Sequence, residues 1–272
     1  KSGGGTLNFS TTTVAGTIDL ATRSFVFGSQ TDTVLGSFEK LVGTSKGDAI
    51  DGTEQRDVID GGGGYDVIYG LGGNDDITLS AGIVRAGSGE DAITLKGMNI
   101  LAFGGDDKDT FKVSGTVTGS ILDGEGGDDV FNVMDVYGRT VSGLTLIGGD
   151  GSDEFNGGQY AASVISYNSS ASGVTLIRGT NGIITATGGD AQGDKINGAF
   201  SIQGSEYNDH IVSAWGSDGY VRGGAGADIL SGGGTIYGDS GADTITSAAG
   251  NHNIYLGADT DIDTFVFSRG LD

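Results

Sequence analysis

The stretch GGGGYDVIYGLGGNDDIT (61–78) consists of two nine-residue units in one register. Each unit opens on glycine and places an Asp at its sixth position and an apolar residue at its eighth. Glycine loses more conformational freedom on folding than other residues, so its regular use indicates turns that need its backbone freedom. A short fixed period of this kind is typical of solenoids, in which each repeat buries its apolar residue only by stacking on the next.

The same register, G-G-x-G-x-D-x-U-x with U apolar, recurs on both sides of this stretch. A first block comprises the two opening units together with GTSKGDAID (43–51), GTEQRDVID (52–60), AGSGEDAIT (86–94), GGDDKDTFK (104–112), GEGGDDVFN (124–132) and GGDGSDEFN (148–156). A second block comprises GDAQGDKIN (189–197), GSEYNDHIV (204–212), GGAGADILS (223–231) and GDSGADTIT (238–246), and it ends on GADTDIDTFVF (257–267).

The segments that precede the two blocks are similar to each other. LNFSTTTVAGTIDL (7–20) resembles ISYNSSASGVTLI (165–177), and both alternate apolar and polar residues as strands do. This indicates a duplication, with each half made of lead-in strands packed over the end of a solenoid. We predict two domains, residues 1–157 with the first lead-in and roll, and residues 158–272 with the second lead-in and roll.

The spacing of the sixth-position acids predicts how the units stack. Successive acids of one series lie mostly 16 to 20 residues apart, so two units make one coil and the acids line one edge of the stack. The edge series in the first block is Asp57, Asp75, Asp91, Asp109, Asp129 and Asp153, beside a shorter series of Asp48 and Asp66. The second block contributes Asp194, Asp209, Asp228, Asp243 and then either Asp261 or Asp263.

These patterns predict an all-β fold, a right-handed parallel β-roll or β-solenoid in two consecutive modules. Each unit is expected to form a six-residue turn and a three-residue strand, because glycines fill the first part and an apolar residue follows the Asp. No segment shows a convincing helical period. The inward eighth residues should stack into an apolar spine, listed in the first block as Ile50, Ile59, Ile68, Ile77, Ile93 and Phe111.

Stacked carboxylates need a compensating charge. Neighbouring strands lie about 4.8 Å apart, so acids on adjacent coils would repel by on the order of a few kcal/mol at a surface-like dielectric. A hard divalent cation between the turns reverses this. Ca²⁺ accepts roughly six to eight oxygens, backbone carbonyls included, whereas Mg²⁺ retains its water shell more strongly. The sequence therefore predicts several bound Ca²⁺ ions.

The composition limits the partners. The chain has 36 acids against 14 bases and a net charge of −22, which disfavours nucleic acid and anionic membranes and favours cations. It contains no Cys, so it has neither disulfides nor thiolate metal sites. No apolar run reaches the length of a transmembrane helix. Because the chain opens on KSGGGT without Met, we expect a fragment of a longer protein.

The repeats resemble the RTX, or haemolysin-type calcium-binding, nonapeptide family, of which this pattern is the known signature. GGAGADILS (223–231) and GDSGADTIT (238–246) match it without a fault, and the lead-ins resemble those of serralysin-like secreted proteins. The resemblance implies that each Ca²⁺ lies between two turns one coil apart, bound by both sixth-position Asp side chains and by turn carbonyls. One implied site comprises Thr53, Gln55 and Asp57 with Gly70, Gly72 and Asp75; another comprises Gly224, Gly226 and Asp228 with Gly238, Ser240 and Asp243.

Other turn residues are implied as carbonyl ligands in the same way: Gly61, Gly63, Gly73, Gly87, Gly89, Gly104, Gly124, Gly126 and Gly223. Two departures matter, because Lys46 and Arg56 add positive charge to the first turns, where we expect weaker binding. The family further implies type I secretion from a Gram-negative bacterium, a secreted or cell-surface location, and folding that awaits extracellular calcium. The implied partners are calcium ions and, for the full-length protein, the type I secretion machinery.

Two other function classes stay open. One is a calcium-dependent surface adhesin or surface-layer protein that binds glycans or itself; Trp215 with Tyr207, Tyr220 and Tyr237 could supply a sugar platform. The other is a β-solenoid enzyme that modifies polysaccharides, which would need clustered basic and aromatic residues. GTSKG (43–47) and GDSG (238–241) resemble nucleophile motifs, but the nonapeptide register already explains them. We therefore predict no catalytic residues and no enzyme activity in this chain.

Overall fold

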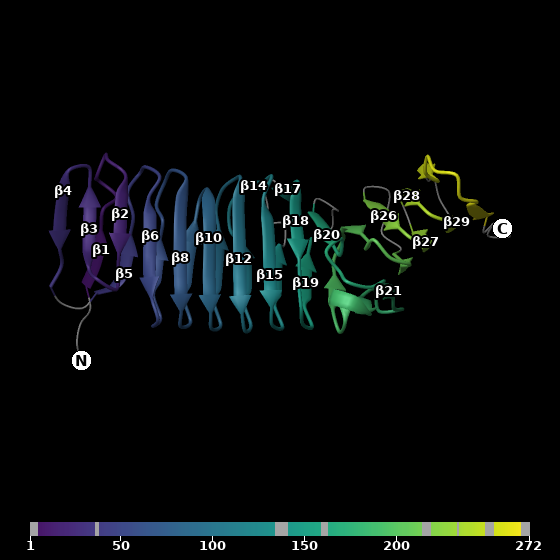
Figure 1. The fold of residues 1–272 in the computed structure, drawn as a ribbon, viewed down its shortest axis with the longest axis horizontal. Coiled ribbons are helices and arrows are strands. Elements are labelled where there is room, and N and C mark those ends of the chain that lie inside the picture. Colours follow the sequence, from purple (N-terminus) through teal and green to yellow (C-terminus); the bar gives the residue numbers. More distant parts are fainter. Residues whose placement is uncertain are drawn as a thin grey trace. The chain divides into compact units, whose positions relative to one another are not determined.

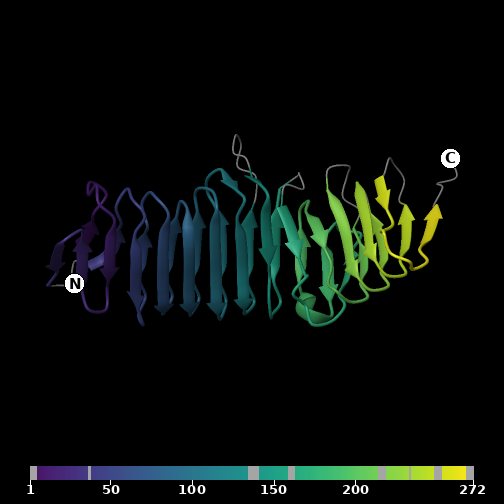
Figure 2. The ribbon, with the colours of Figure 1, turned by 45° about the horizontal axis from the view of Figure 1, so that its top comes forward.

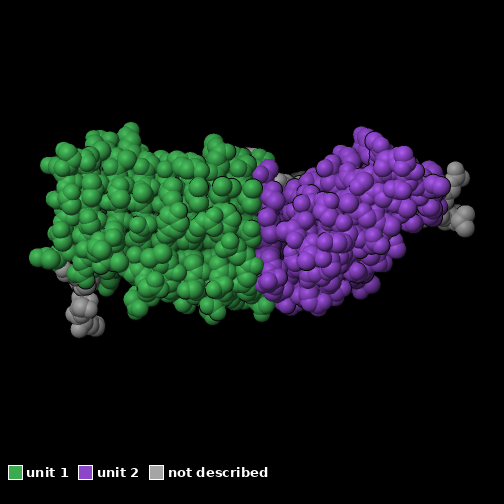
Figure 3. All heavy atoms as spheres, in the orientation of Figure 1, with its two compact units in different colours: residues 1–132, 136–142 green, residues 133–135, 143–272 purple. Residues whose placement is uncertain are grey.

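The computed structural model describes residues 5–35, 38–133, 141–158, 163–213, 219–232, 234–247 and 253–267. The chain divides into two compact units, residues 1–132 with 136–142 and residues 133–135 with 143–272, which Figure 3 shows in different colours. Each unit is described by itself. The division expected from the duplication, at residues 157 and 158, stays a prediction.

Unit 1 consists of two sheets, and from residue 38 onward their strands alternate along the chain (Figure 1). The first contains β1 (Gly5–Asn8), β5 (Phe38–Val42), β7 (Val58–Asp60), β9 (Asp76–Leu79), β11 (Ala92–Leu95), β13 (Thr110–Val113) and β16 (Val130–Val133), in that order. The second contains β4 (Gln30–Thr33), β3 (Ser24–Phe27), β2 (Gly16–Asp19), β6 (Ala49–Thr53), β8 (Asp66–Gly72), β10 (Gly82–Ser88), β12 (Ile100–Asp106) and β15 (Ile121–Gly126). A short pair is formed by β14 (Val117–Thr118) and β17 (Val141–Ser142).

Parallel pairing between successive coils defines this fold. β8, β10 and β12 pair in register with one another, and so do β9, β11 and β13 in the other sheet. These strands are longer than the predicted three residues, because pairing continues into the turns, where Ser88 lies opposite Gly72. The predicted all-β solenoid of parallel, stacked coils is therefore confirmed.

The core of unit 1 is the row of eighth-position residues on each sheet. Leu41, Ile59, Ile77, Ile93 and Phe111 follow one another in register on one sheet. The opposite row is Ile18, Ile50, Ile68, Val84, Ala102 and Leu122. Every one of these side chains is at most 1% exposed, which confirms the predicted spine. Each fully buried aliphatic side chain contributes about 1.5–3 kcal/mol, so stability comes from the stack and not from single coils.

Strands β2 to β4 of the lead-in are antiparallel, whereas β1 pairs in parallel with β5. β2, β3 and β4 form consecutive antiparallel pairs, and β2 then pairs in parallel with β6, the first strand of a repeat. The Phe9 ring contacts the rings of Phe25 and Phe27 beside this hairpin. The lead-in thus covers the edge of the stack with ordinary side-chain packing.

Unit 2 is also built from two sheets (Figure 2). One contains β19 (Glu154–Gly157), β23 (Lys195–Asn197), β22 (Ile184–Thr187), β21 (Thr175–Arg178), β25 (His210–Val212), β27 (Ile229–Gly232), β29 (Thr244–Ser247) and β31 (Thr264–Phe267). The other contains β18 (Leu144–Ile147), β20 (Ser163–Ser166), β24 (Ser201–Gln203), β26 (Tyr220–Ala225), β28 (Thr235–Ser240) and β30 (Asn253–Tyr255). A 3-10 turn, η1 (Gly189–Ala191), precedes β23.

A hairpin interrupts the parallel pairing of unit 2. β22 runs antiparallel to both β21 and β23, so it separates the β19–β23 pair from the run β21–β25–β27–β29–β31. This hairpin belongs to the second lead-in and corresponds to β2–β3 of unit 1. Among the described residues we find no apolar helix long enough to span a membrane.

Candidate metal centre

The sixth-position aspartates of unit 1 form two hydrogen-bonded columns. In each step, the backbone N–H of one Asp donates to the carboxylate Oδ1 of the Asp in the next coil. The longer column has donor–acceptor pairs Asp57–Asp75 at 2.7 Å, Asp75–Asp91 at 2.7 Å, Asp91–Asp109 at 2.8 Å and Asp109–Asp129 at 2.7 Å. The shorter column is Asp48–Asp66 at 2.9 Å. The predicted alignment of these acids along the stack is what the structure shows.

Unit 2 repeats the arrangement. The N–H of Asp209 donates to Asp228 at 2.8 Å, that of Asp228 to Asp243 at 3.0 Å, and that of Asp243 to Asp263 at 3.0 Å. Of the two alternatives at the end of this series, Asp263 therefore lies in the column. Asp261 is exposed, and its N–H donates to Asp259.

Asp194 lies beside Asp153 and not beside Asp209, with which the sequence period groups it. The Asp153 N–H donates to Asp194 Oδ1 at 2.8 Å, although 41 residues separate them in sequence. The β21–β22 hairpin takes the next place in the sheet, so the N–H of Val174 donates to Asp209 Oδ1 instead, at 2.7 Å. An inserted hairpin breaks the simple relation between spacing in sequence and neighbours in space.

The second carboxylate oxygen of most column members is buried and lacks a hydrogen-bond partner. This holds for Oδ2 of Asp66, Asp75, Asp91, Asp109, Asp228 and Asp243. All six side chains belong to residues that are at most 2% exposed. A buried carboxylate oxygen without a partner is strongly unfavourable, so each of these sites calls for a proton or a cation.

The pKa values of these carboxyl groups also indicate that each requires a proton or a cation. Burial raises the pKa of Asp66 and Asp75 to about 7, and that of Asp109 to about 8. Neighbouring column acids add to the effect, as Asp91 and Asp57 do for Asp75. Stacking therefore produces groups that do not hold a bare negative charge easily at neutral pH.

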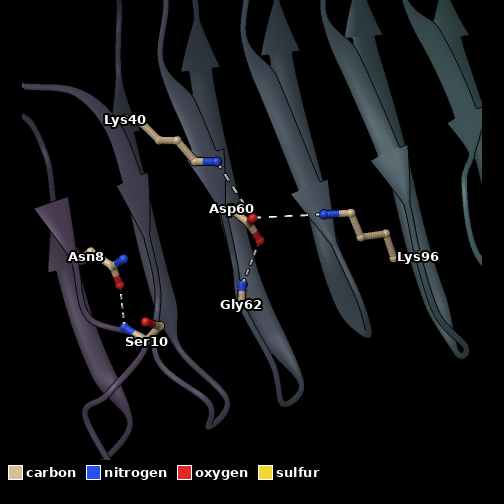
Figure 4. Close-up of polar contacts among 6 residues, drawn as sticks. All are labelled: Asn8, Ser10, Lys40, Asp60, Gly62 and Lys96. Atoms are coloured by element: carbon tan, nitrogen blue, oxygen red, sulfur yellow. Dashed lines mark hydrogen bonds and ion pairs between the residues drawn. The ribbon is translucent and has the colours of Figure 1, made fainter. Parts of the chain in front are cut away.

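Asp60, which lies outside the columns, is neutralised differently (Figure 4). Its Oδ2 lies 3.9 Å from the Nζ atoms of both Lys40 and Lys96, and its Oδ1 accepts a hydrogen bond from the Gly62 N–H at 3.1 Å. This carboxylate is partly exposed and faces two lysines. Asp60 thus has basic partners, whereas the Oδ2 atoms of the columns lie against the first residue of their own turns.

The turn backbone brings oxygen atoms close to the columns. In the turn that precedes Asp91, Gly87 and Gly89, at the second and fourth positions, have φ of 117° and 116°. A Cβ on Gly87 would collide with the Leu71 carbonyl oxygen of the preceding coil, and a Cβ on Gly105 with the Gly87 carbonyl oxygen. Carbonyl oxygens of successive coils are thus packed against the glycines of the next turn.

Three non-glycine residues adopt the same unusual conformation at the second turn position. Leu71, Glu125 and Asp239 have φ of 79°, 68° and 71°. Such a conformation costs on the order of 1 kcal/mol or more for an L-residue, and it concentrates at functional sites. The turn geometry is therefore maintained even where the sequence disfavours it.

These donors fit calcium. The described residues contain no group of three or more His, Cys, Asp or Glu side chains that could hold a metal, so a metal in these turns would have to use backbone oxygens beside the carboxylates. A set of carboxylate and carbonyl oxygens suits Ca²⁺, which accepts six to eight of them in flexible geometry. Zn²⁺ would require the His and Cys ligands that these turns lack.

The predicted glycine ligands all lie in the column turns. Those at the first position pack against the carboxylate of their own turn: a Cβ on Gly61 would lie 2.6 Å from Asp66 Oδ2, and Gly70, Gly104, Gly223 and Gly238 have the same relation to their Asp. Gly124 is at the first position of the Asp129 turn. The other predicted ligands are at the second to fourth positions of column turns: Gly63, Gly72, Gly73, Gly87, Gly89, Gly126, Gly224, Gly226 and Ser240. Their individual ligation of metal stays a prediction.

Five segments match the family described as "RTX calcium-binding nonapeptide repeat (4 copies)": residues 42–77, 51–85, 145–159, 220–234 and 235–263. The chain carries RTX calcium-binding nonapeptide repeats. The turns of Asp91 and Asp109 lie between the matched segments, yet they have the hydrogen bonds and burial of the RTX turns on either side. No curated protein matches the chain.

Three tyrosines of unit 2 contact one another or a guanidinium group. The rings of Tyr237 and Tyr255 stack on each other with centroids 4.9 Å apart, and the Arg222 guanidinium lies 4.8 Å from the Tyr237 centroid. Tyr220 meets Tyr237 edge-on at 6.2 Å. Tyr207 is 50% exposed and Trp215 lies outside the described residues, so the sugar platform stays a prediction.

Period analysis missed the hydroxyl groups that bind column acids. Thr44 and Ser205 stand where glycine is usual, and the Tyr167 hydroxyl donates to Asp194 Oδ2 at 2.9 Å. A Ser or Thr at the second turn position was a visible signal. Tyr167 is 27 residues from its partner, in the lead-in, so the repeat pattern contains no signal for it.

Proposed function

We propose that this chain is the calcium-binding RTX β-roll of a secreted bacterial protein and that it completes its folding when calcium binds outside the cell. The observation that carries the proposal is the stack of buried Oδ2 atoms without hydrogen-bond partners, found in both units. A calcium ion supplies the positive charge that these oxygens need. RTX repeats in a β-solenoid are the arrangement expected of a calcium-binding roll.

The residues that would hold the ions are neighbouring column acids with the turn carbonyls between them. Asp75 with Asp91, Asp91 with Asp109, and Asp228 with Asp243 are the pairs in which both Oδ2 atoms are buried and lack partners. The hydrogen bond from each Asp N–H to the next Oδ1 holds the two carboxylates in place. Metal binding to such a site would couple directly to folding, because the two acids of a pair come together only in the stacked state.

The coupling of calcium binding to folding also supports an extracellular location. Extracellular calcium modules typically bind with dissociation constants of about 10⁻⁴–10⁻³ M, which keeps them empty inside a cell and filled outside. An incompletely folded acidic chain suits export by a type I system, and the ion-free state would be kept loose by the net charge of −22. We propose no enzyme activity for this segment, since its acids are used as a repeated structural set.

Circular dichroism during a calcium titration tests the proposal. The protein in EDTA should lack much of its β-sheet signal and acquire it between about 0.1 and several millimolar Ca²⁺, the range of extracellular modules. Equal concentrations of Mg²⁺ should have little effect, because Mg²⁺ retains its water shell. Both spectra are recorded at about neutral pH. If the spectrum in EDTA is identical to that in about 5–10 mM Ca²⁺, calcium-dependent folding is contradicted.

A further inference from the structure

Most column turns have one of two backbone geometries. Most are open, with positive φ at the second and fourth positions, as in Gly224 (115°) and Gly226 (114°). The turns of Asp48, Asp57 and Asp209 are closed. None of the residues at their second and fourth positions, Thr44, Lys46, Thr53, Gln55, Ser205 and Tyr207, has a positive φ. Each of these three turns has Ser or Thr at its second position. The turns of Asp194 and Asp263 also lack a positive φ at these positions but have Asp190 and Asp259 at the second, so they belong to neither class.

In a closed turn, hydrogen-bond donors of the turn itself bind the carboxylate oxygens of the column Asp. The Ser205 N–H donates to Asp209 Oδ2 at 2.6 Å, and the Ser205 hydroxyl donates to Asp209 Oδ1 at 2.8 Å. The Tyr207 N–H then donates to the Ser205 Oγ at 3.1 Å. With the Val174 N–H also bound to Oδ1, both oxygens of Asp209 have partners. Such local side-chain-to-backbone hydrogen bonds are what Ser and Thr characteristically form in turns.

The Thr44 turn has the same hydrogen bonds, and the Thr53 turn uses the same donors with both directed to one carboxylate oxygen. The Thr44 N–H donates to Asp48 Oδ2 at 2.6 Å and its hydroxyl to Asp48 Oδ1 at 2.8 Å. The Thr53 N–H and hydroxyl both donate to Asp57 Oδ2, at 2.7 and 3.0 Å. Lys46 and Gln55 complete the pattern, because their N–H groups donate to the Thr hydroxyls at 3.0 and 3.1 Å.

We propose that the second turn residue determines which RTX turns take calcium. An open turn, with positive φ at that position, leaves Oδ2 for the ion. A Ser or Thr there closes the turn, and its hydroxyl and N–H replace the ion, so Thr53 and Gln55 would not be metal ligands. This inference rests on the proposed calcium function and specifies which turns carry it out.

The closed turns lie at the start of the columns, where a coil that folds without metal could support the coils that follow. Asp48, Asp57 and Asp209 are each the first acid of their column. Asp48 and Asp209 also receive a backbone N–H from the lead-in, from Gly16 at 2.6 Å and Val174 at 2.7 Å. Each of these two columns therefore begins with a coil that is complete without metal and fixed to the lead-in hairpin, on which the calcium-binding coils can stack.

The variant Ser205→Ala tests the closed turn. It removes the hydroxyl and leaves the backbone able to keep its conformation. The melting temperature is measured over a calcium series, in which the slope against log [Ca²⁺] reports the ions released on unfolding. We expect Ser205→Ala to lower the melting temperature by the same amount at every concentration, with an unchanged slope. Ser213→Ala, at a buried serine outside the turns, is the matched control and should also leave the slope unchanged.

The reverse variant, Gly224→Ser, tests the open turn. Ser at this second position should close the turn, so equilibrium dialysis should show at least one Ca²⁺ fewer per chain. Gly224→Ala adds the same Cβ without the hydroxyl. Each variant is first shown by circular dichroism to be folded in saturating calcium. We expect Gly224→Ser to be the more stable of the two at low calcium, since only Ser can bond to Asp228.

The outcomes separate this inference from the calcium function itself. A wild-type melting temperature that does not change with calcium would overturn both. A calcium-dependent wild type with a smaller slope or fewer bound ions in Ser205→Ala would overturn the inference alone, because the hydroxyl would then belong to a metal site. Unchanged ion number in a folded Gly224→Ser would likewise overturn it.

Discussion

The Tyr167 hydroxyl donates a hydrogen bond of 2.9 Å to Asp194 Oδ2. In column acids such as Asp75 and Asp91, the equivalent Oδ2 atom has no hydrogen-bond partner. Tyr167 is 2% exposed, and burial together with Asp194 raises the pKa of its hydroxyl well above its ordinary value, so the hydroxyl remains a donor at all physiological pH values. The lead-in of unit 2 thus supplies a side chain to Asp194.

Tyr167→Phe should lower the stability of the protein by about 1–3 kcal/mol, the cost of leaving a buried acceptor without its donor. The loss should be measured by urea unfolding at fixed calcium concentration. Tyr69→Phe is a suitable control, because Tyr69 is 41% exposed and its hydroxyl loss should change stability little. Equal effects of the two substitutions would show that the Tyr167–Asp194 bond contributes nothing specific.

The sequence period was sufficient to predict the columns and the spine, and the reason is geometric. Ile59 and Ile77 are 18 residues apart and lie opposite each other in register, since two units make one coil. Asp194 was placed wrongly relative to its neighbours because a hairpin inserted between β23 and β25 changes which coil follows. The closed turns were missed although their Ser and Thr are visible in the sequence, because the period counts Thr53 as one more variable position, whereas its hydroxyl bonds to Asp57.

Asp75→Asn should raise the calcium concentration at the folding midpoint by about tenfold or more, since removal of even a supporting partner of a metal ligand costs roughly 10–100-fold in affinity. Asp75 is 2% exposed and lies between Asp57 and Asp91 in the column. Asp76→Asn changes the net charge equally at the next residue, whose side chain is only partly buried, and it should leave the midpoint nearly unchanged. Similar midpoint shifts in both variants would mean that general charge, and not the column, controls calcium binding.

The stability of the calcium-free protein should fall as pH rises. Burial raises the pKa of Asp75 to about 7, with Asp91 and Asp57 adding to the rise and Arg56 opposing it, whereas the unfolded carboxyl has an ordinary pKa near 3.8. Between these two values the folded state binds more protons, so protonation stabilises it there, and this contribution is lost as pH rises through about 7.

Circular dichroism in EDTA at pH 5, 6, 7 and 8, values spanning about the range over which such carboxyls titrate, tests the direction. The β-sheet signal of the calcium-free protein should be largest at the acidic end. In saturating calcium the dependence should weaken or reverse, because protons then compete with the ion for the same oxygens. Asp75→Asn should flatten the EDTA profile. A calcium-free stability that increases towards pH 8 would be incompatible with buried, proton-binding columns.

Two adjacent glycines of one turn should respond differently to the same substitution. Gly64, at the fourth position, has φ of 105°, and a Cβ there would collide with the backbone of Lys46 and Gly47 in the preceding coil. Gly63 has no positive φ, and its Cβ would meet nothing closer than the Ser45 Cα at 3.7 Å. We expect Gly64→Ala to destabilise the protein by on the order of 1–3 kcal/mol, the usual cost of a forced backbone conformation.

Gly63→Ala should be neutral or stabilise slightly, by up to about 1 kcal/mol, because it restricts the unfolded chain without straining the folded one. Urea unfolding of both variants in saturating calcium provides the comparison. If the turn were loosely packed, both alanines would be accepted alike. A clear difference between neighbouring positions requires that the backbones of successive coils touch at the fourth position, which is the contact that places turn oxygens beside the column carboxylates.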